Sequence, residues 1–110
     1  MIPPILTLHY ELIQELNTAR DLLDALNAAG IKGAEEQFLS EKIHELETNL
    51  DDSAGEVQRL IDQLGDNKAR IFASLHFQGG YQWAEIAGIF GLMEPATKAS
   101  VYRALHSTNL

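Results

Sequence analysis

Cysteine is absent from this 110-residue chain, and no apolar run is long enough to cross a bilayer. Without cysteine there can be no disulfide and no thiolate metal site. A membrane-spanning helix needs about 20 predominantly apolar residues, and no stretch of the chain approaches that length. Residues 1–4 also lack the basic region and the long apolar core of a signal peptide. We therefore expect a cytoplasmic protein that associates with no membrane.

Basic residues are scarce, and their distribution divides the chain into two regions. The sequence has 8 Lys and Arg against 16 Asp and Glu, which gives a net charge of −8. Residues 1–65 hold 13 of the acids and 4 of the Lys and Arg, so this region carries −9. Residues 66–110 hold the other 3 acids and 4 Lys and Arg, so this region carries +1. Because phosphate backbones require a basic face, the net charge argues against a simple nucleic-acid binder, and the nearly neutral second region permits DNA binding without indicating it.

No group of residues has the spacing of a metal site or a catalytic centre. No two histidines lie three to five residues apart, so they show no metal-ligand spacing, and we expect them at solvent-facing or edge positions: His9, His44, His76 and His106. Gly79-Gly80 lacks the glycine and lysine pattern of a phosphate-binding loop, so it is interpreted as a helix stop. No serine or histidine is marked as activated. The sequence predicts no enzyme, no catalytic residue, no metal and no cofactor.

Apolar residues in the first region recur at the heptad spacing of packed helices. A first stretch, from about residue 5 to residue 29, has this spacing, and GIKG at 30–33 then lets the chain reverse. The second stretch has a longer seam, which only Ser53 interrupts. This seam consists of Leu39, Ile43, Leu46, Leu50, Val57, Leu60 and Leu64.

The seam implies coiled-coil-like packing, and two partners for it are open. One partner is the first helix, folded back as a hairpin, which the short GIKG turn favours. The other is the same helix of another subunit, and both arrangements coexist if hairpins pair into a four-helix bundle. We expect the hairpin, and we predict the seam as the surface for homo-oligomerisation.

Two features near Ser53 predict different structures. Ser53 followed by Glu56 matches a capping box, which would begin a new helix. The continuous heptad spacing instead favours one helix, with Gly55 on the solvent side at a cost of about 1 kcal/mol relative to alanine. We favour the single helix, ended by Gly65.

Three shorter helices are expected in the second region, over about 66–78, 82–90 and 94–106. Asp66 or Asn67 can cap the first of them. Gly91 can take the positive φ that ends the second, and Leu92 would then fill the turn. The overall prediction is an all-α fold. A long N-terminal helical hairpin over 1–65, coiled-coil-like, is followed by a three-helix helix-turn-helix unit over 66–110.

The run GYQWAEIAGIFG, followed by ATKASVYRAL, resembles the DNA-reading region 4 of sigma-70-type factors. It also resembles small phage regulators of the ArpU-like and RinA-like kind. In these families a glycine precedes a polar cap, an aromatic residue and Glu-Ile-Ala. The corresponding residues here are Gly80, Gln82, Trp83 and Glu85-Ile86-Ala87. The closing Val101-Tyr102-Arg103-Ala104-Leu105 matches the sigma-like ending, and the resemblance covers about 40 residues.

This resemblance implies a phage-type transcriptional regulator that binds double-stranded DNA, with a host protein such as RNA polymerase as a further partner. The residues expected to contact DNA are Gln82, Thr97, Lys98, Ser100 and Arg103. The chain departs from the family pattern at three places: Gln82 replaces a Ser or Thr cap, Thr97 replaces an aliphatic core residue, and Met93-Glu94-Pro95 opens the second helix. Because Lys98 is the only conventional contact on the reading surface, we expect weak binding per subunit, which dimerisation would multiply.

The aromatic residues of the second region are expected in its core rather than on a base-stacking platform: Phe72, Phe77, Trp83 and Phe90. Tyr81 is placed equally well to contact a DNA phosphate. The alternative function is an acidic protein-binding module or inhibitor with a degenerate helix-turn-helix. In that case the −9 region would meet a basic surface on a host nucleic-acid machine.

Overall fold

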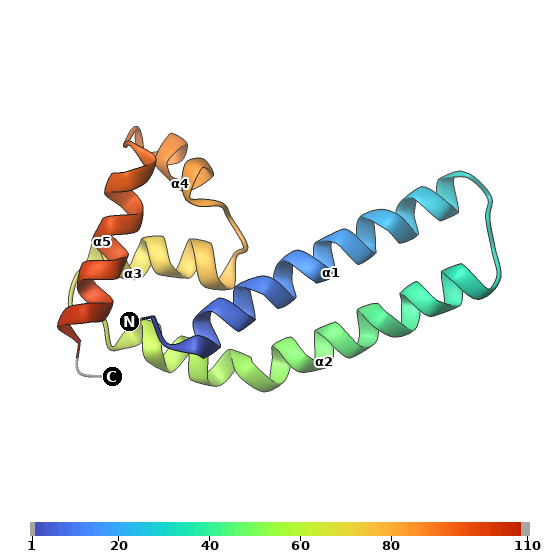
Figure 1. Ribbon diagram of the computed structural model, residues 1–110, viewed down its shortest axis with the longest axis horizontal. Coiled ribbons are helices and arrows are strands. Elements are labelled where there is room, and N and C mark those ends of the chain that lie inside the picture. Colours follow the sequence, from blue (N-terminus) through green and yellow to red (C-terminus); the bar gives the residue numbers. More distant parts are fainter. Residues whose placement is uncertain (1, 109–110) are drawn as a thin grey trace.

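The computed structural model describes residues 2–108, and these residues form helices and turns with no strand (Figure 1). This confirms the predicted all-α fold. The elements are α1 (Pro4–Ala28), α2 (Ala34–Asp62), α3 (Asn67–Ala73), a π-helical segment η1 (Ser74–Gln78), α4 (Trp83–Phe90) and α5 (Glu94–Ser107). The long pair α1 and α2 extends to one side of the shorter helices, so the molecule measures 50 × 30 × 18 Å.

The two long helices pack against each other as an antiparallel hairpin (Figure 1). In the outer half of the hairpin, Leu16 and Ala19 of α1 are buried against Leu46 of α2. Leu39, Ile43 and Leu50 are partly buried around them. Val57, Leu60 and Leu64 are buried closer to the C-terminal helices. Within the chain, α1 and the shorter helices therefore bury Leu46, Val57, Leu60 and Leu64 of the predicted oligomerisation seam, and its other residues are partly buried.

Helix α2 runs without a break through the segment around Ser53, as the heptad spacing predicts. Gly55 lies exposed on its outer side. Ser53, the polar residue that interrupts the seam, contacts His9 of α1. The His9 Nδ1 lies 2.6 Å from Ser53 Oγ in a hydrogen bond. His9 is buried, so the expectation that this histidine faces solvent is wrong. Ser53 Oγ also lies 3.2 and 3.3 Å from the Asn49 and Leu50 carbonyls of α2, so the contact with His9 links α1 to a hydroxyl that is already bonded within its own helix.

The third helix begins as predicted and ends in a different conformation. Asp66 caps α3, and its side chain accepts a hydrogen bond from the Lys68 N–H at 3.0 Å. Beyond residue 73 the chain widens into η1, where the Gly79 N–H donates to the Ser74 carbonyl, five residues back. The wider turn lets the consecutive residues His76 and Phe77 both point inward.

A stack of three aromatic rings joins the hairpin to the shorter helices. The His76 ring lies between Tyr10 of α1, at 4.1 Å, and Trp83 of α4, at 3.9 Å between ring centroids. His76 Nδ1 is 2.7 Å from the Tyr81 carbonyl. His76 is buried, which is a second exception to the expectation of solvent-facing histidines. Trp83 and His76 thus set the position of α4 relative to the hairpin.

Candidate nucleic-acid interface

The α4–α5 turn has the backbone that the sequence predicts. Gly91 ends α4 with φ 67° and ψ 32°, in the left-handed region that favours glycine. The Leu92 N–H then donates to the Ala87 carbonyl at 2.8 Å, and Met93 is the N-cap of α5. Pro95 lies in the first turn of α5, where it has no helical hydrogen bond to break. Leu92 is 42% exposed, so it does not fill the turn as expected.

The inner faces of α4 and α5 pack together and against α3. Ile86 and Val101 are fully buried, and Ala87 and Leu105 are nearly so. The small side chain of Ala87 allows α4 and α5 to approach closely. As a result, α5 forms the edge of the molecule at the end opposite the hairpin tip, with its outer face free (Figure 1).

Thr97 does not lie on that outer face. Its side chain is 0% exposed, and its hydroxyl donates to the Glu94 carbonyl at 2.8 Å. One turn from Val101 on the same side of α5, it occupies a core position and uses its hydroxyl within the helix. Thr97 is therefore removed from the predicted set of DNA contacts.

Lys98 and Arg103 are exposed on different flanks of α5. Five residues separate them, which places them about 140° apart around the helix axis. The Lys98 ammonium lies 5.3 Å from the centroid of the Tyr102 ring, a cation–π distance. The predicted contacts of α5 consequently lie on two sides of the helix, not on one face.

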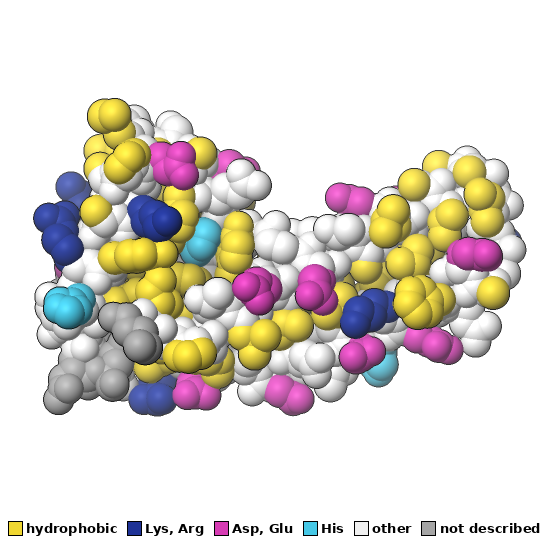
Figure 2. Space-filling view, viewed as in Figure 1, with side chains coloured by type: hydrophobic (Ala, Val, Ile, Leu, Met, Phe, Trp, Pro, Cys, Tyr) yellow, Lys and Arg dark blue, Asp and Glu magenta, His cyan; other side chains and the backbone are white. Residues whose placement is uncertain are grey.

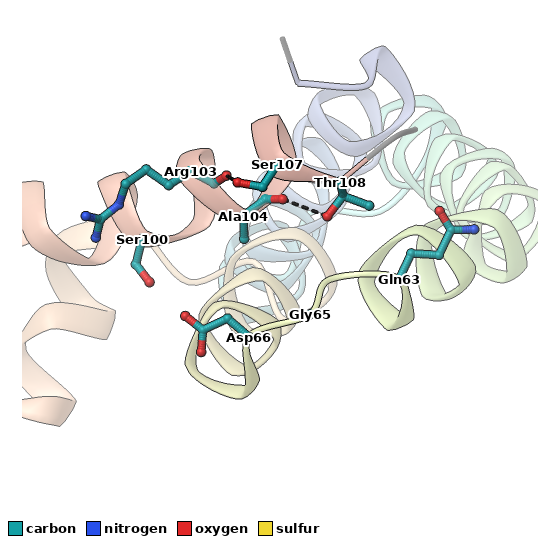
Figure 3. A pocket seen from close by; sticks show the side chains of 8 residues that line it. All are labelled: Gln63, Gly65, Asp66, Ser100, Arg103, Ala104, Ser107 and Thr108. Atoms are coloured by element: carbon teal, nitrogen blue, oxygen red, sulfur yellow. Dashed lines mark hydrogen bonds between the residues drawn. The ribbon is translucent and has the colours of Figure 1, made fainter.

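The flank that carries Arg103 borders a groove of about 550 Å³ between α5 and the α2–α3 connection (Figure 3). Most of the residues that line it have polar side chains, and the lining comprises Gln63, Gly65, Asp66, Ser100, Arg103, Ala104, Ser107 and Thr108. Ser107 and Thr108 donate their hydroxyl hydrogens to the Arg103 and Ala104 carbonyls, so these two hydroxyls are engaged within α5. Ser100 thus lies beside Arg103, on the opposite flank from Lys98.

Gln82 lies at the start of α4, where the sequence predicts it. It is the N-cap residue, and its backbone N–H donates to the Glu85 carboxylate at 2.9 Å. Its side chain is exposed, but the neighbouring carboxylate disfavours a phosphate at this helix end. The structure therefore brings Gln82, Lys98, Ser100 and Arg103 onto the surface of one unit without clustering them.

The outward centre of the first two turns of α5 is apolar, which the sequence interpretation did not use. Pro95, Ala96 and Ala99 are exposed there, and Met93 at the helix start is 75% exposed. Together with Leu92 they form a surface that we call the apolar tip (Leu92, Met93, Pro95, Ala96 and Ala99). The sequence already indicated this apolar surface, because the start of the expected reading helix has few side chains that can form hydrogen bonds.

Charges are distributed unevenly over the surface (Figure 2). On the face shown, Asp and Glu side chains are spread along the hairpin, where some Lys and Arg also lie, and further Lys and Arg lie close to α5. Within residues 2–108 there is no group of three His, Asp or Glu side chains arranged to hold a metal. None of the helices described is both long and apolar enough to cross a membrane.

Comparison with protein-family models, curated proteins and solved structures finds no match to this chain.

Proposed function

We propose that this protein is a transcriptional regulator of phage type that binds double-stranded DNA through α5. The observation that carries the proposal is the position of α5. Its inner face is buried by α3 and α4, and its outer face is free at the edge of the molecule. A helix held in this way by a preceding helix and a short turn has the arrangement with which helix-turn-helix proteins enter the major groove.

The two exposed cations of α5 support this proposal. Lys98 and Arg103 lie on opposite flanks of the helix, and the major groove is bordered by a phosphate backbone on each side. One cation can therefore meet each backbone while the centre of the helix faces the bases. The +1 charge of residues 66–110 permits this approach, whereas the −9 charge of residues 1–65 would keep the hairpin away from the duplex.

The test is binding of the pure protein to a mixed-sequence duplex, followed by fluorescence anisotropy at about 50 and about 200 mM salt. We expect affinity to fall steeply over this range, because each phosphate contact releases counterions. Lys98→Glu should reduce binding at low salt at least tenfold, since it reverses a charge placed against a phosphate. Lys32→Glu is the matched control. It makes the same charge change in the hairpin turn, remote from α5, and should have little effect.

Absence of binding at the lower salt concentration would contradict DNA binding. Equal losses for Lys98→Glu and Lys32→Glu would show a general charge effect and remove α5 from the interface. The helical signal in far-ultraviolet circular dichroism should be the same in all three proteins, because both lysines are exposed.

A second candidate function is an acidic module that binds a host protein, and the tip of the hairpin favours it. Leu22, Ile31 and Phe38 are exposed on this outer part of the hairpin, and exposed large apolar side chains can mark a surface that binds another protein. With the acidic hairpin around them, they suit a partner that is basic and partly apolar. Co-sedimentation with purified RNA polymerase tests this function. Phe38→Ser should weaken the association if the tip of the hairpin is the contact. Equal co-sedimentation of the original protein and of this variant would exclude the hairpin tip as the contact.

A further inference from the structure

The apolar tip occupies the part of α5 that would face base edges if the proposed function holds. In helix-turn-helix proteins, the N-terminal residues of the second helix contact the bases. Here the exposed residues at the outward centre of this part of the helix are Met93, Pro95, Ala96 and Ala99, and none of these four has a hydrogen-bonding group on its side chain. The inference that follows rests on the proposed function and concerns which base edges the same surface would select.

The polar residues of the first two turns are directed elsewhere. Thr97 is buried, and its hydroxyl is bonded to the Glu94 carbonyl. Lys98 lies over the Tyr102 ring on one flank, and Ser100 lines the groove on the other. Glu94 is an anion, which only a cytosine amino group could attract in the major groove. Few side chains here can therefore form the hydrogen bonds to base edges by which most such helices recognise a DNA sequence.

The major groove contains one apolar group, the C5-methyl of thymine. An apolar helix surface pressed into this groove gains contact and loses water where methyl groups meet it, but it leaves donors and acceptors unpaired elsewhere. Met93 is suited to this contact, because its unbranched thioether side chain adapts to irregular apolar surfaces. The flanking cations, Lys98 and Arg103, match the phosphates on either side of such a site and favour DNA over an apolar protein surface as the occupant.

We infer that the apolar tip reads thymine methyl groups, so that this protein prefers A·T-rich duplexes through apolar contacts rather than hydrogen bonds. Burial of one methyl group contributes about 0.8 kcal/mol, which corresponds to a preference of about fourfold for each thymine contacted.

The experiment compares duplexes that differ only in the C5-methyl group. One A·T-rich duplex is made with thymine and again with uracil, which lacks the methyl but keeps every hydrogen-bonding group of the base. One G·C-rich duplex is made with cytosine and again with 5-methylcytosine, which carries a methyl at the equivalent major-groove position. Affinities are measured by anisotropy with the full chain at low salt. We expect tighter binding to the methylated member of each pair, by about fourfold per contacted methyl.

Met93→Ala locates the contact. Met93 is exposed and makes no side-chain capping hydrogen bond, so its replacement should not disturb folding. We expect this variant to lower the affinity ratio of thymine to uracil duplexes while retaining salt-dependent binding. Phe38→Ala is the matched control, since it removes another largely exposed apolar side chain, at the far end of the hairpin. Its ratio should equal that of the original protein.

The outcomes separate this inference from the function on which it rests. Salt-dependent binding with equal affinity for both members of each pair would overturn methyl reading and leave the DNA-binding function standing. A preference for thymine over uracil without a preference for 5-methylcytosine would also overturn it, because the effect would then come from duplex flexibility. A thymine preference unchanged by Met93→Ala would overturn the assignment to the apolar tip. Absence of binding to all four duplexes would remove the function and the inference together.

Discussion

His76 is the residue through which three elements meet, since its ring stacks on Tyr10 of α1 and on Trp83 of α4. Burial lowers the pKa of His76 below the ordinary value of 6.5, and nearby Lys98 also lowers it, although the hydrogen bond to the Tyr81 carbonyl acts in the opposite direction. Burial likewise lowers the pKa of His9. Both imidazoles are therefore held neutral in the folded protein more strongly than in the unfolded chain.

We expect stability to fall as the pH decreases below about 6.5. The contribution of each neutral imidazole is fully present above the unfolded-state pKa and is lost as the pH falls through the lowered folded-state pKa. Urea unfolding, followed by the fluorescence of the single tryptophan at several pH values, measures this effect. His76→Phe keeps a flat ring between Tyr10 and Trp83 but cannot ionise, so its stability should depend less on pH.

His44→Gln is the control for this prediction, because it also removes one histidine but at an exposed position of α2. A pH dependence that is the same in His76→Phe and in the original protein would assign the effect to other groups.

At the scale of single elements, two glycines have opposite roles. Gly55 lies inside α2, and a Cβ added there would meet no atom within 4 Å. Gly80 follows η1 with φ 78°, and a Cβ there would lie 2.6 Å from Ile13 Cγ2 of α1. Its carbonyl accepts a hydrogen bond from the Gln14 side chain at 2.8 Å. Gly55 is a weak point of a regular helix, whereas Gly80 allows the close approach of α1 to the connection before α4.

We expect Gly55→Ala to raise the free energy of unfolding by about 1 kcal/mol, because alanine restricts the unfolded chain and suits a helix interior. Gly80→Ala should lower it by about 2–4 kcal/mol, through left-handed backbone strain and the contact with Ile13. Denaturant unfolding of the two variants in parallel measures both changes. Effects of the same sign would contradict the roles assigned to these glycines.

At the scale of the whole molecule, the hairpin and the shorter helices share one core. Leu6 of α1 and Val57, Leu60 and Ile61 of α2 are buried together with Phe72, Phe77, Trp83, Ile86, Val101 and Leu105. The predicted boundary at residue 65 therefore falls within a continuous packed region. The outer half of the hairpin instead has its own small cluster around Leu46.

We expect residues 66–110 alone to remain largely unfolded, because the fragment lacks the apolar side chains that α1 and α2 contribute to its core. Circular dichroism of the fragment tests this expectation. In the full chain, Ile61→Ala should lower the free energy of unfolding by about 2–5 kcal/mol. The midpoints of unfolding seen by circular dichroism and by Trp83 fluorescence should fall together. A fragment that is as helical as the same residues in the full chain would contradict the shared core.

Much of the fold could be predicted from local patterns. The heptad spacing predicted two long helices, and the GIKG segment predicted their reversal. Asp66, Gly91 and Pro95 marked helix ends whose observed backbone agrees with the prediction. Each of these signals depends on residues a few positions apart, so the sequence alone contains the necessary information.

The candidate site was predicted less completely. The sequence placed Lys98, Ser100 and Arg103 on one helix, and their spacing already puts Lys98 and Arg103 on different flanks, but it did not show which face of that helix its neighbours cover. It also proposed Thr97 as a contact, although the same resemblance marks that position as one that an aliphatic core residue usually fills. Burial decides between these roles, and burial depends on which helix covers Thr97.

The sequence by itself determined the all-α class, the hairpin turn, the helix ends and the division of charge between the two regions, because propensity, capping and composition act locally. Tertiary structure alone decided three matters. It assigned the seam of α2 to α1, buried His9 and His76, and left Met93 and its apolar neighbours facing outward. The physical reason is that the burial of a side chain depends on contacts between residues far apart in the chain. One local pattern of apolar residues can be buried by any of several partners, so the pattern alone does not show which partner it has.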